Sequence, residues 1–244
     1  MNLLDIVGPI AVAALRGRRI LLAGASGNNG GPVLKQLLAL GLDVRALSRQ
    51  ARRSSATVGA TPPGKLEWMQ GDVIRPATLG RVLDGIDIVI SAVAGRPFGG
   101  PPPEVVDYQG TANLAAAARV AGVRRFVIIT SSGSGRKGGL INFIGRNVLV
   151  WKGKAEDALR ESGLEYVIVG PARMTGEPGG TRRIRLIPRD QYVRTMQVTR
   201  DDLASVVIGA AGSPDAANRV FSAINVDGPA DGAWRDDLAR MPSR

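Results

Sequence analysis

Short apolar runs alternate with amphipathic stretches from residue 19 onward. Six of the runs have the length of buried parallel strands, and they cover residues 20–23, 44–47, 66–70, 86–91, 125–130 and 166–169. The stretches with helical spacing cover residues 33–40, 78–83, 108–121 and 147–162. A glycine follows three of these helices at the position of a C-terminal cap. The alternation predicts an α/β fold of the Rossmann type, with a doubly wound parallel sheet and right-handed crossovers.

The pattern loosens after Gly170, which indicates a small C-terminal portion on the substrate side of a single domain. Short strands are expected at residues 184–187, 197–198 and 221–224, with a helix at residues 201–211. We therefore divide the chain into an N-terminal segment (1–18), a Rossmann domain (19–228) and a weakly ordered C-terminal tail (229–244).

The N-terminal segment is apolar from residue 3 to 15, and three arginines follow between residues 16 and 19. It is too short to span a bilayer, which needs ~20 residues. Its charges follow the apolar stretch, whereas a secretory signal carries them before it. Two interpretations remain open: a helix packed on the domain or on a second subunit, and a helix that docks on a protein complex or an anionic membrane surface. We accordingly expect a cytoplasmic protein, peripheral at the cytoplasmic membrane face under the second interpretation.

Composition narrows the available chemistry. The 244 residues include no cysteine and no histidine, which excludes disulfides, thiolate nucleophiles, imidazole bases and the usual zinc ligands. We therefore expect no metal site. The net charge is +11, but the basic residues are spread along the chain, as on a solvated surface.

The densest basic segment covers residues 182–194. It could bind a phosphorylated substrate, an anionic lipid surface or RNA, or it could be a solvated edge. Single-stranded nucleic-acid readers interleave aromatic side chains with their cations, and this segment does not. Nucleic acid is therefore not an expected partner.

A glycine-rich loop follows the first strand and opens the first helix of the domain. It reads Gly-Ala-Ser-Gly-Asn-Asn-Gly over residues 24–30. Gly24 permits a tight turn, Gly27 lets the backbone approach a pyrophosphate, and Gly30 allows close packing of helix on strand. The helix N-terminus adds free N–H groups and the positive end of its dipole. This context predicts a dinucleotide cradle.

The end of the second strand indicates which dinucleotide is bound. An NAD site usually has an acidic residue there, about 20 residues beyond the loop, to hold the ribose 2′-hydroxyl. This chain has Ser48 and Arg49, with Arg52 and Arg53 close behind. Guanidinium groups suit the 2′-phosphate of NADP(H), which is therefore the expected cofactor.

Two more strand ends suit the same ligand. Asp72 and Val73 follow the third strand, where an acid could accept from the adenine amino group. Ala92 and Val93 follow the fourth, where small residues would let a ribose lie close. For each pair, ordinary turn chemistry is the competing interpretation.

Taken in order, these motifs resemble the atypical short-chain dehydrogenase/reductases, and most closely their NAD(P)-binding, NmrA-like group. The resemblance covers residues 19–211 and rests on the segments GASGNNG, LSR, GDV, ISAVAG, GVRRFVIITSS, WKGKAEDALRESGLEYVIVGP and VTRDDLA. It implies that NADP is bound by Gly24, Ser26, Gly27, Asn28, Asn29, Arg49, Asp72, Ala92 and Val93. It also implies that Ser131, Lys152 and Pro171 lie near the nicotinamide.

The chain departs from this family at two positions. Catalysis in the superfamily usually needs a Tyr four residues before the Lys, and Val148 stands there instead. Lys152 could still bond the nicotinamide ribose, and Ser131 or Ser132 could still bond a substrate, so these three are the candidate catalytic residues. The second departure is Gly170 before Pro171, where relatives often carry Arg, so we expect an altered mouth of the nicotinamide pocket.

Two functions fit these residues. The first is an NADPH-dependent reductase for a quinone, a flavin or an enone-like small molecule, because such acceptors tolerate a missing protein acid. The second is a non-catalytic NADP(H)-binding redox sensor or structural subunit of a larger, membrane-associated assembly. A sugar-nucleotide epimerase or dehydratase is less compatible with the missing Tyr.

Overall fold

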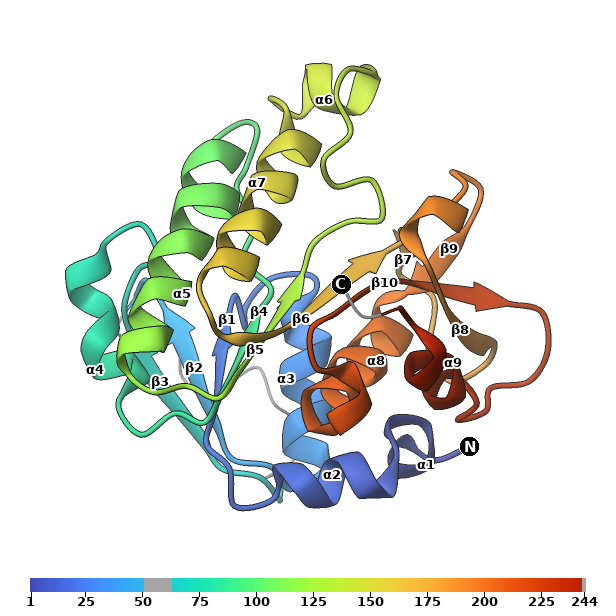
Figure 1. The fold of residues 1–244 in the computed structure, drawn as a ribbon. Coiled ribbons are helices and arrows are strands. Elements are labelled where there is room, and N and C mark those ends of the chain that lie inside the picture. The colour runs from blue at the N-terminus through green and yellow to red at the C-terminus, as the bar shows by residue number, and fades with distance from the viewer. Residues whose placement is uncertain (51–62, 243–244) are drawn as a thin grey trace.

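An eight-stranded sheet organises the molecule (Figure 1). The structure is a computed structural model that describes residues 1–50 and 63–242. The strand order is β3-β2-β1-β4-β5-β6-β10-β8. These strands are β1 (Ile20–Ala23), β2 (Val44–Ser48), β3 (Leu66–Gln70), β4 (Ile88–Ser91), β5 (Arg125–Ile129), β6 (Glu165–Pro171), β8 (Arg183–Ile187) and β10 (Arg219–Val226). Neighbours pair in parallel except β8, which runs antiparallel to β10. The chain order reverses between β1 and β4, which confirms the doubly wound α/β fold.

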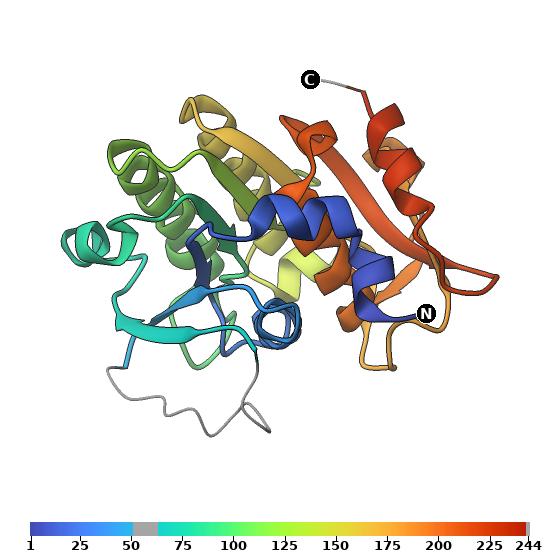
Figure 2. The same ribbon diagram turned by 90° about the horizontal axis from the view of Figure 1, so that it is seen from below.

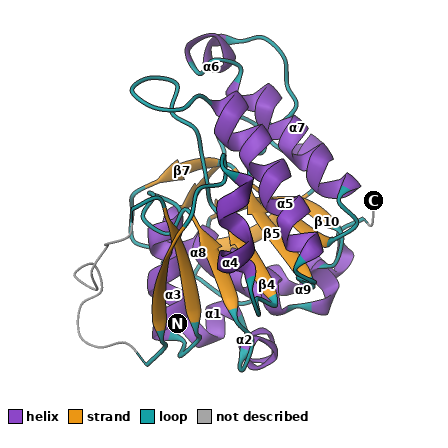
Figure 3. Ribbon diagram, turned by 90° about the vertical axis from the view of Figure 1, so that its left-hand side faces the viewer, coloured by secondary structure: helices purple, strands orange, loops and turns teal. Residues whose placement is uncertain are grey.

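Helices cover both faces of the sheet (Figure 3). One face carries α3 (Gly30–Ala39) and α8 (Arg200–Gly212), and the other carries α4 (Leu79–Leu83), α5 (Gly110–Val120) and α7 (Val148–Glu161). Alternate residues of β1 pack into the cores on the two faces of the sheet, because successive side chains of a strand point to opposite faces. Ile20 and Leu22 belong to the core with α3 and α8, whereas Leu21 belongs to the core with α4 and α5.

Smaller elements complete the chain. Within the described residues, short helical turns also precede or join the main elements, namely η2 (Pro76–Thr78), η4 (Arg189–Gln191) and η5 (Pro214–Ala216). A second, two-stranded parallel sheet pairs β7 (Arg173–Thr175) with β9 (Gln197–Thr199). A single helix was expected over residues 108–121, but a π-helical segment, η3 (Glu104–Gln109), comes first and leads directly into α5. The further helix α6 (Leu140–Ile144) was not expected, because glycines flank its short apolar run on both sides.

The N-terminal segment packs against the domain. It forms α1 (Leu3–Val7) and α2 (Pro9–Leu15), which lie along α8 in the view from below (Figure 2). Val7, Val12 and Leu15 are buried in the core that includes α8. Most of the apolar side chains that suggested a docking helix are therefore covered within this chain, and Ile10 is the large exposed exception on α2.

The expectation of a weakly ordered C-terminal tail was wrong. Residues 234–240 form α9 (Trp234–Arg240), and Trp234 is completely buried. Arg185 of β8 makes two hydrogen bonds, of 2.6 and 2.8 Å, to the carboxylate of Asp237, which raises the pKa of Arg185. This helix is hard to predict from the local pattern, because its apolar side is formed by few residues, chiefly Trp234 and Leu238.

Candidate functional site

The glycine loop sits at the point where the sheet order reverses, between the ends of β1 and β4. Gly24 has a φ of +85°, and a Cβ atom there would lie 2.7 Å from the carbonyl carbon of Ala92. A Cβ atom at Gly30 would collide with the carbonyl oxygen of Gly24. Both positions therefore exclude a side chain, and the loop, the start of α3 and the end of β4 meet backbone to backbone.

The N-terminus of α3 opens toward this loop. Asn29 is its N-cap, and its side chain makes no capping hydrogen bond. The amide of Gly27 donates to the carbonyl of Gly24 at 2.9 Å, which closes the turn. Within the described part of the chain, no acceptor is bonded to the amides of Ser26 or Asn28. A tight turn with free donors at a helix N-terminus forms a cradle for phosphate oxygens, so the loop fits a pyrophosphate.

A pocket opens beside the ends of β2 and β3. It is lined by Arg49, Met69, Gln70, Gly71, Asp72, Arg75, Ala77, Thr78, Gly80, Arg81 and Asp84. Three guanidinium groups in one pocket, with Arg49 at the strand end, make it suitable for an anionic ligand. Arg52 and Arg53, which the sequence also placed here, lie outside the described residues.

The turn after β3 is fixed internally. Asp72 accepts a hydrogen bond from the Ile74 amide through Oδ1 at 3.1 Å, and its own amide donates to the Thr78 hydroxyl. Val73 is buried, and its carbonyl accepts from Asn113. Asp72 and Val73 thus form a rigid turn at the rim of the pocket, so an adenine partner and a structural turn are both compatible with this geometry.

Lys152 of α7 reaches the loop that follows β4. Its Nζ atom lies 2.6 Å from Oδ1 of Asp107, which is almost completely buried in η3. The other carboxylate oxygen of Asp107 accepts from the Gly95 amide at 2.7 Å. Asp107 therefore joins Lys152 to the loop after β4, the same strand end that meets Gly24. The sequence analysis did not single out Asp107, because its partner Lys152 lies 45 residues away along the chain.

Tyr108 does not replace the missing tyrosine. Its ring stacks on Trp151 with centroids 6.0 Å apart, and the Lys154 ammonium lies 4.5 Å from the Trp151 ring centroid. Val148, at the position of the expected tyrosine, is the first residue of α7. Tyr108 accordingly packs η3 on α7.

The two candidate serines lie in one turn after β5 but differ in their bonding. Ser132 is buried, and its hydroxyl donates to the carbonyl of Gly170 at 2.8 Å. Ser131 is partly exposed, and its hydroxyl accepts from the Gly133 amide at 3.2 Å. The Ser132 amide also donates to the carbonyl of Pro171. Ser132 therefore ties this turn to β6, and Ser131 is the better candidate for a contact with a ligand.

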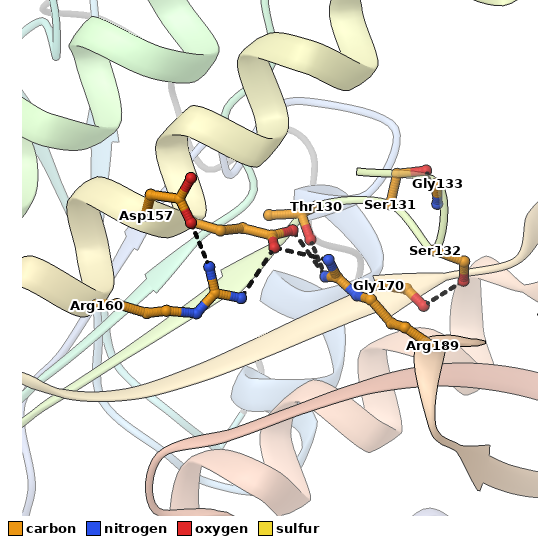
Figure 4. Close-up of polar contacts among 9 residues, drawn as sticks. Thr130, Ser131, Ser132, Gly133, Asp157, Arg160, Gly170 and Arg189 are labelled. Carbon is orange, nitrogen blue, oxygen red and sulfur yellow. Dashed lines mark hydrogen bonds and ion pairs between the residues drawn. The ribbon is translucent and has the colours of Figure 1, made fainter. Parts of the chain in front are cut away.

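A buried ion-pair network lies beside this turn (Figure 4). Arg189 of η4 donates to both oxygens of Glu156, at 2.6 and 2.7 Å, and to the Thr130 hydroxyl at 3.0 Å. Arg160 adds a longer contact of 3.4 Å to Glu156 and pairs with Asp157 at 2.7 Å. The network fastens the C-terminal portion to α7 next to the end of β5.

This network also bears on the glycine at position 170. A Cβ atom at Gly170 would lie 2.9 Å from the backbone of Ser131, so the serine turn occupies the space beside it. A guanidinium group nonetheless reaches this edge of the sheet, because Arg189 supplies one from a different segment. In the sequence, Arg189 is recognised only as a member of the basic segment over residues 182–194. Its partners are 33 and 59 residues away, and nothing in the local pattern indicates them.

Comparison with known proteins decides the family. The chain matches the NAD(P)H-binding family over residues 24–214. The chain belongs to this family. Membership confirms the resemblance to atypical short-chain dehydrogenase/reductases and makes a nicotinamide dinucleotide the cofactor of this domain. It does not distinguish NADP from NAD.

Individual relatives of this NAD(P)H-binding protein include plant proteins. It is 35% identical to the chloroplastic protein TIC 62 of Pisum sativum over 199 residues, which is 74% of this chain. It spans only 35% of that protein's length. It is 28% identical to sanguinarine reductase of Eschscholzia californica, with 83% of this chain and 87% of the reductase covered.

Solved structures share the fold. The oxidoreductase ylbE of Lactococcus lactis superposes with a TM-score of 0.73 at 22% identity, covering 91% of this chain and 95% of that one. At this level of identity the likeness shows the fold alone. None of the helices in the described ranges has the length and apolar character needed to cross a membrane.

Proposed function

We propose that this protein is an NADPH-dependent reductase that passes hydride to an extended acceptor, such as a quinone, a flavin or an enone, without a catalytic tyrosine. The observation that carries the proposal is the Lys152–Asp107 pair at the end of β4, in a chain with valine at position 148. The similarity to sanguinarine reductase supports a reductase as the class.

The cofactor contacts follow from the strand ends. We assign the pyrophosphate to the loop formed by Gly24, Ser26, Gly27, Asn28, Asn29 and Gly30. Asp72 and Val73 would border the adenine, and Ala92 and Val93 would border the ribose. Arg49 would pair with the 2′-phosphate, because no acidic residue stands at the end of β2 to hold a free hydroxyl. These contacts make NADP(H) the proposed cofactor.

The chain's own residues would orient the reactants. Bound NADPH supplies the hydride, and Lys152 and the Pro171 end of β6 would border the nicotinamide. Asp107 holds one of the three Lys152 donors, which leaves two for a ribose. The Ser131 hydroxyl accepts from Gly133, so its own proton is available for an acceptor oxygen. With valine at position 148, the final proton would come from water, which suits acceptors that delocalise charge.

Cofactor preference tests the first half of the proposal. Replacement of Arg49 by Ala removes a charge-assisted contact and should weaken NADPH binding by about 10- to 100-fold. NADH binding should stay unchanged. Arg124→Ala is the matched control, because Arg124 is exposed and lies at the amino end of β5, whereas Arg49 lies at the carboxyl end of β2. Equal affinities of the native protein for NADPH and NADH, measured by cofactor fluorescence, would overturn the choice of NADP.

Turnover tests the second half. Purified protein is mixed with NADPH and a panel of quinones, free flavins and enones, and absorbance of the reduced cofactor is followed. We expect oxidation with at least one acceptor and a lower kcat in Ser131→Ala. Oxidation no faster than background for every acceptor would contradict the reductase.

The alternative is a non-catalytic NADP(H)-binding sensor or assembly subunit. It is favoured by the absence of the superfamily's tyrosine at position 148 and by the similarity to one part of TIC 62. Tight NADPH binding without turnover on any acceptor would support it.

A further inference from the structure

A short helix presents apolar side chains to solvent. Leu140, Ile141, Phe143 and Ile144 of α6 are 70%, 56%, 86% and 52% exposed. Figures 1 and 3 both show α6 at the tip of the molecule, beyond the N-terminal end of α7. Large apolar residues gathered on one exposed element commonly mark an interaction surface, whereas single exposed ones do not.

The fold holds this tip in place. Asn142, the remaining residue of α6, is buried and points inward. Its amide donates to the carbonyls of Arg136 and Gly138 at 2.7 and 3.0 Å, and its oxygen accepts from the Leu149 amide at 3.0 Å. One polar side chain thus anchors the helix from both sides while its apolar neighbours face outward. The exposure is therefore a consequence of specific bonding within the described chain.

The surroundings of the helix are basic. Arg136, Lys137 and Arg146 flank it and are exposed, and no Asp or Glu occurs from residue 131 to residue 155. The Arg136 guanidinium lies over the ring of Tyr192, 5.6 Å from its centroid. The two residues that follow Tyr192, a valine and an arginine, are also exposed. We call residues 136–146 the α6 tip.

We propose that the α6 tip docks on an anionic lipid surface. Apolar side chains surrounded by cations match the boundary between acyl chains and acidic headgroups. A second copy of this chain is a poorer occupant, because a symmetric contact would set the same arginines and lysine against each other. The helix has five residues, so it would enter the interface without crossing the bilayer.

This surface is distinct from the N-terminal segment, whose apolar residues are largely covered by α8. The docking itself does not depend on the reductase activity. One consequence does rest on the proposed function: α6 adjoins the N-terminal end of α7, the helix that carries Lys152, so docking would turn this end of α7 toward an acceptor dissolved in lipid.

Vesicle flotation tests the proposal with the full chain. We expect the protein to float with vesicles of phosphatidylcholine mixed with phosphatidylglycerol. With vesicles of pure phosphatidylcholine, it should stay at the bottom of the gradient. Phe143→Ser should lower the partition coefficient of the protein between vesicles and buffer about tenfold or more. Lys137→Gln should reduce it about fivefold, and added salt should act in the same direction. Because both side chains are exposed, the variants should keep the native melting temperature.

Ile10→Ser is the matched control, since Ile10 is 81% exposed on α2 and should not contribute. The absence of native protein from the floating fraction would overturn the proposal. An equal loss in Ile10→Ser would do the same, because it would move the contact to the N-terminal segment. Light scattering provides the remaining outcome: a dimer that Phe143→Ser dissociates would identify a second copy as the occupant and reject the lipid surface.

Discussion

Lys152 and Asp107 form an ion pair that joins α7 to the segment following β4. Their 2.6 Å contact is largely buried, and the second carboxylate oxygen of Asp107 accepts a hydrogen bond from the Gly95 amide. The carboxylate thus compensates the lysine and also fixes a loop beside the glycine turn. A positioning role for Asp107 follows from these two contacts.

Asp107→Asn should test that role. The neutral amide leaves the Lys152 ammonium partly buried without its counter-charge, so the free energy of unfolding should fall by about 3 kcal/mol. NADPH binding should weaken as well, because the amide has one acceptor oxygen for two donors, so either Lys152 or the Gly95 amide loses its partner. Urea denaturation and cofactor titration measure the two effects. Asp157→Asn is the control, since its carboxylate is exposed and its loss should cost less than about 0.5 kcal/mol. Equal losses in both variants would argue against a special place for Asp107.

The glycine loop offers a sharper comparison between two adjacent residues. Gly30→Ala forces a methyl group against the Gly24 carbonyl, whereas the nearest atom to a Cβ at Gly31 is 3.9 Å away. We expect Gly30→Ala to lower the free energy of unfolding by about 3 kcal/mol and to abolish detectable dinucleotide binding. Gly31→Ala lies in the first turn of α3 and should be neutral or stabilising by up to about 1 kcal/mol. If Gly30→Ala bound NADPH normally, the close approach of helix and strand would not be needed.

The sequence predicted the features of the fold that depend on local pattern. Apolar runs located the strands, and glycines located the loop and the helix ends. The prediction failed where two side-chain partners are distant in the sequence, or where the burial of a residue differs from what the polarity of its neighbours suggests. Asp107 and Lys152 are 45 residues apart, so no spacing rule connects them. The α6 run has the composition of a buried element, yet Asn142 turns the other residues outward. Trp234 stands in a polar stretch and is buried all the same.

The Glu156–Arg189 pair should be strongly coupled. Glu156 is buried and Arg189 is largely buried, and two hydrogen bonds join them. In a double-mutant cycle with Glu156→Gln and Arg189→Gln, we expect a coupling energy of about 2 kcal/mol or more, because each single variant leaves a buried charge unpaired. The pair Arg182–Asp227 serves as the control, since it is exposed and should show no measurable coupling. Chemical denaturation of the four proteins in each cycle measures the free energies of unfolding. If the losses of stability at Glu156 and Arg189 were additive, the network would be contradicted.

Trp234 ties both ends of the chain to α8. Its indole Nε1 donates to the carbonyl of Ile6 in α1 at 2.9 Å, and its ring fills the space beside Gly209, where a Cβ atom would lie 2.6 Å from the ring. Trp234→Ala should therefore lower the free energy of unfolding by about 3 to 5 kcal/mol. Gly209→Ala should also destabilise, because the methyl group and the indole compete for one volume. Phe98→Ala is the matched control, since that ring is exposed and its loss should cost less than about 0.5 kcal/mol. A melting temperature that Trp234→Ala leaves unchanged would mean that α1 and α9 do not stabilise the domain, and the N-terminal segment would then be free to detach from α8.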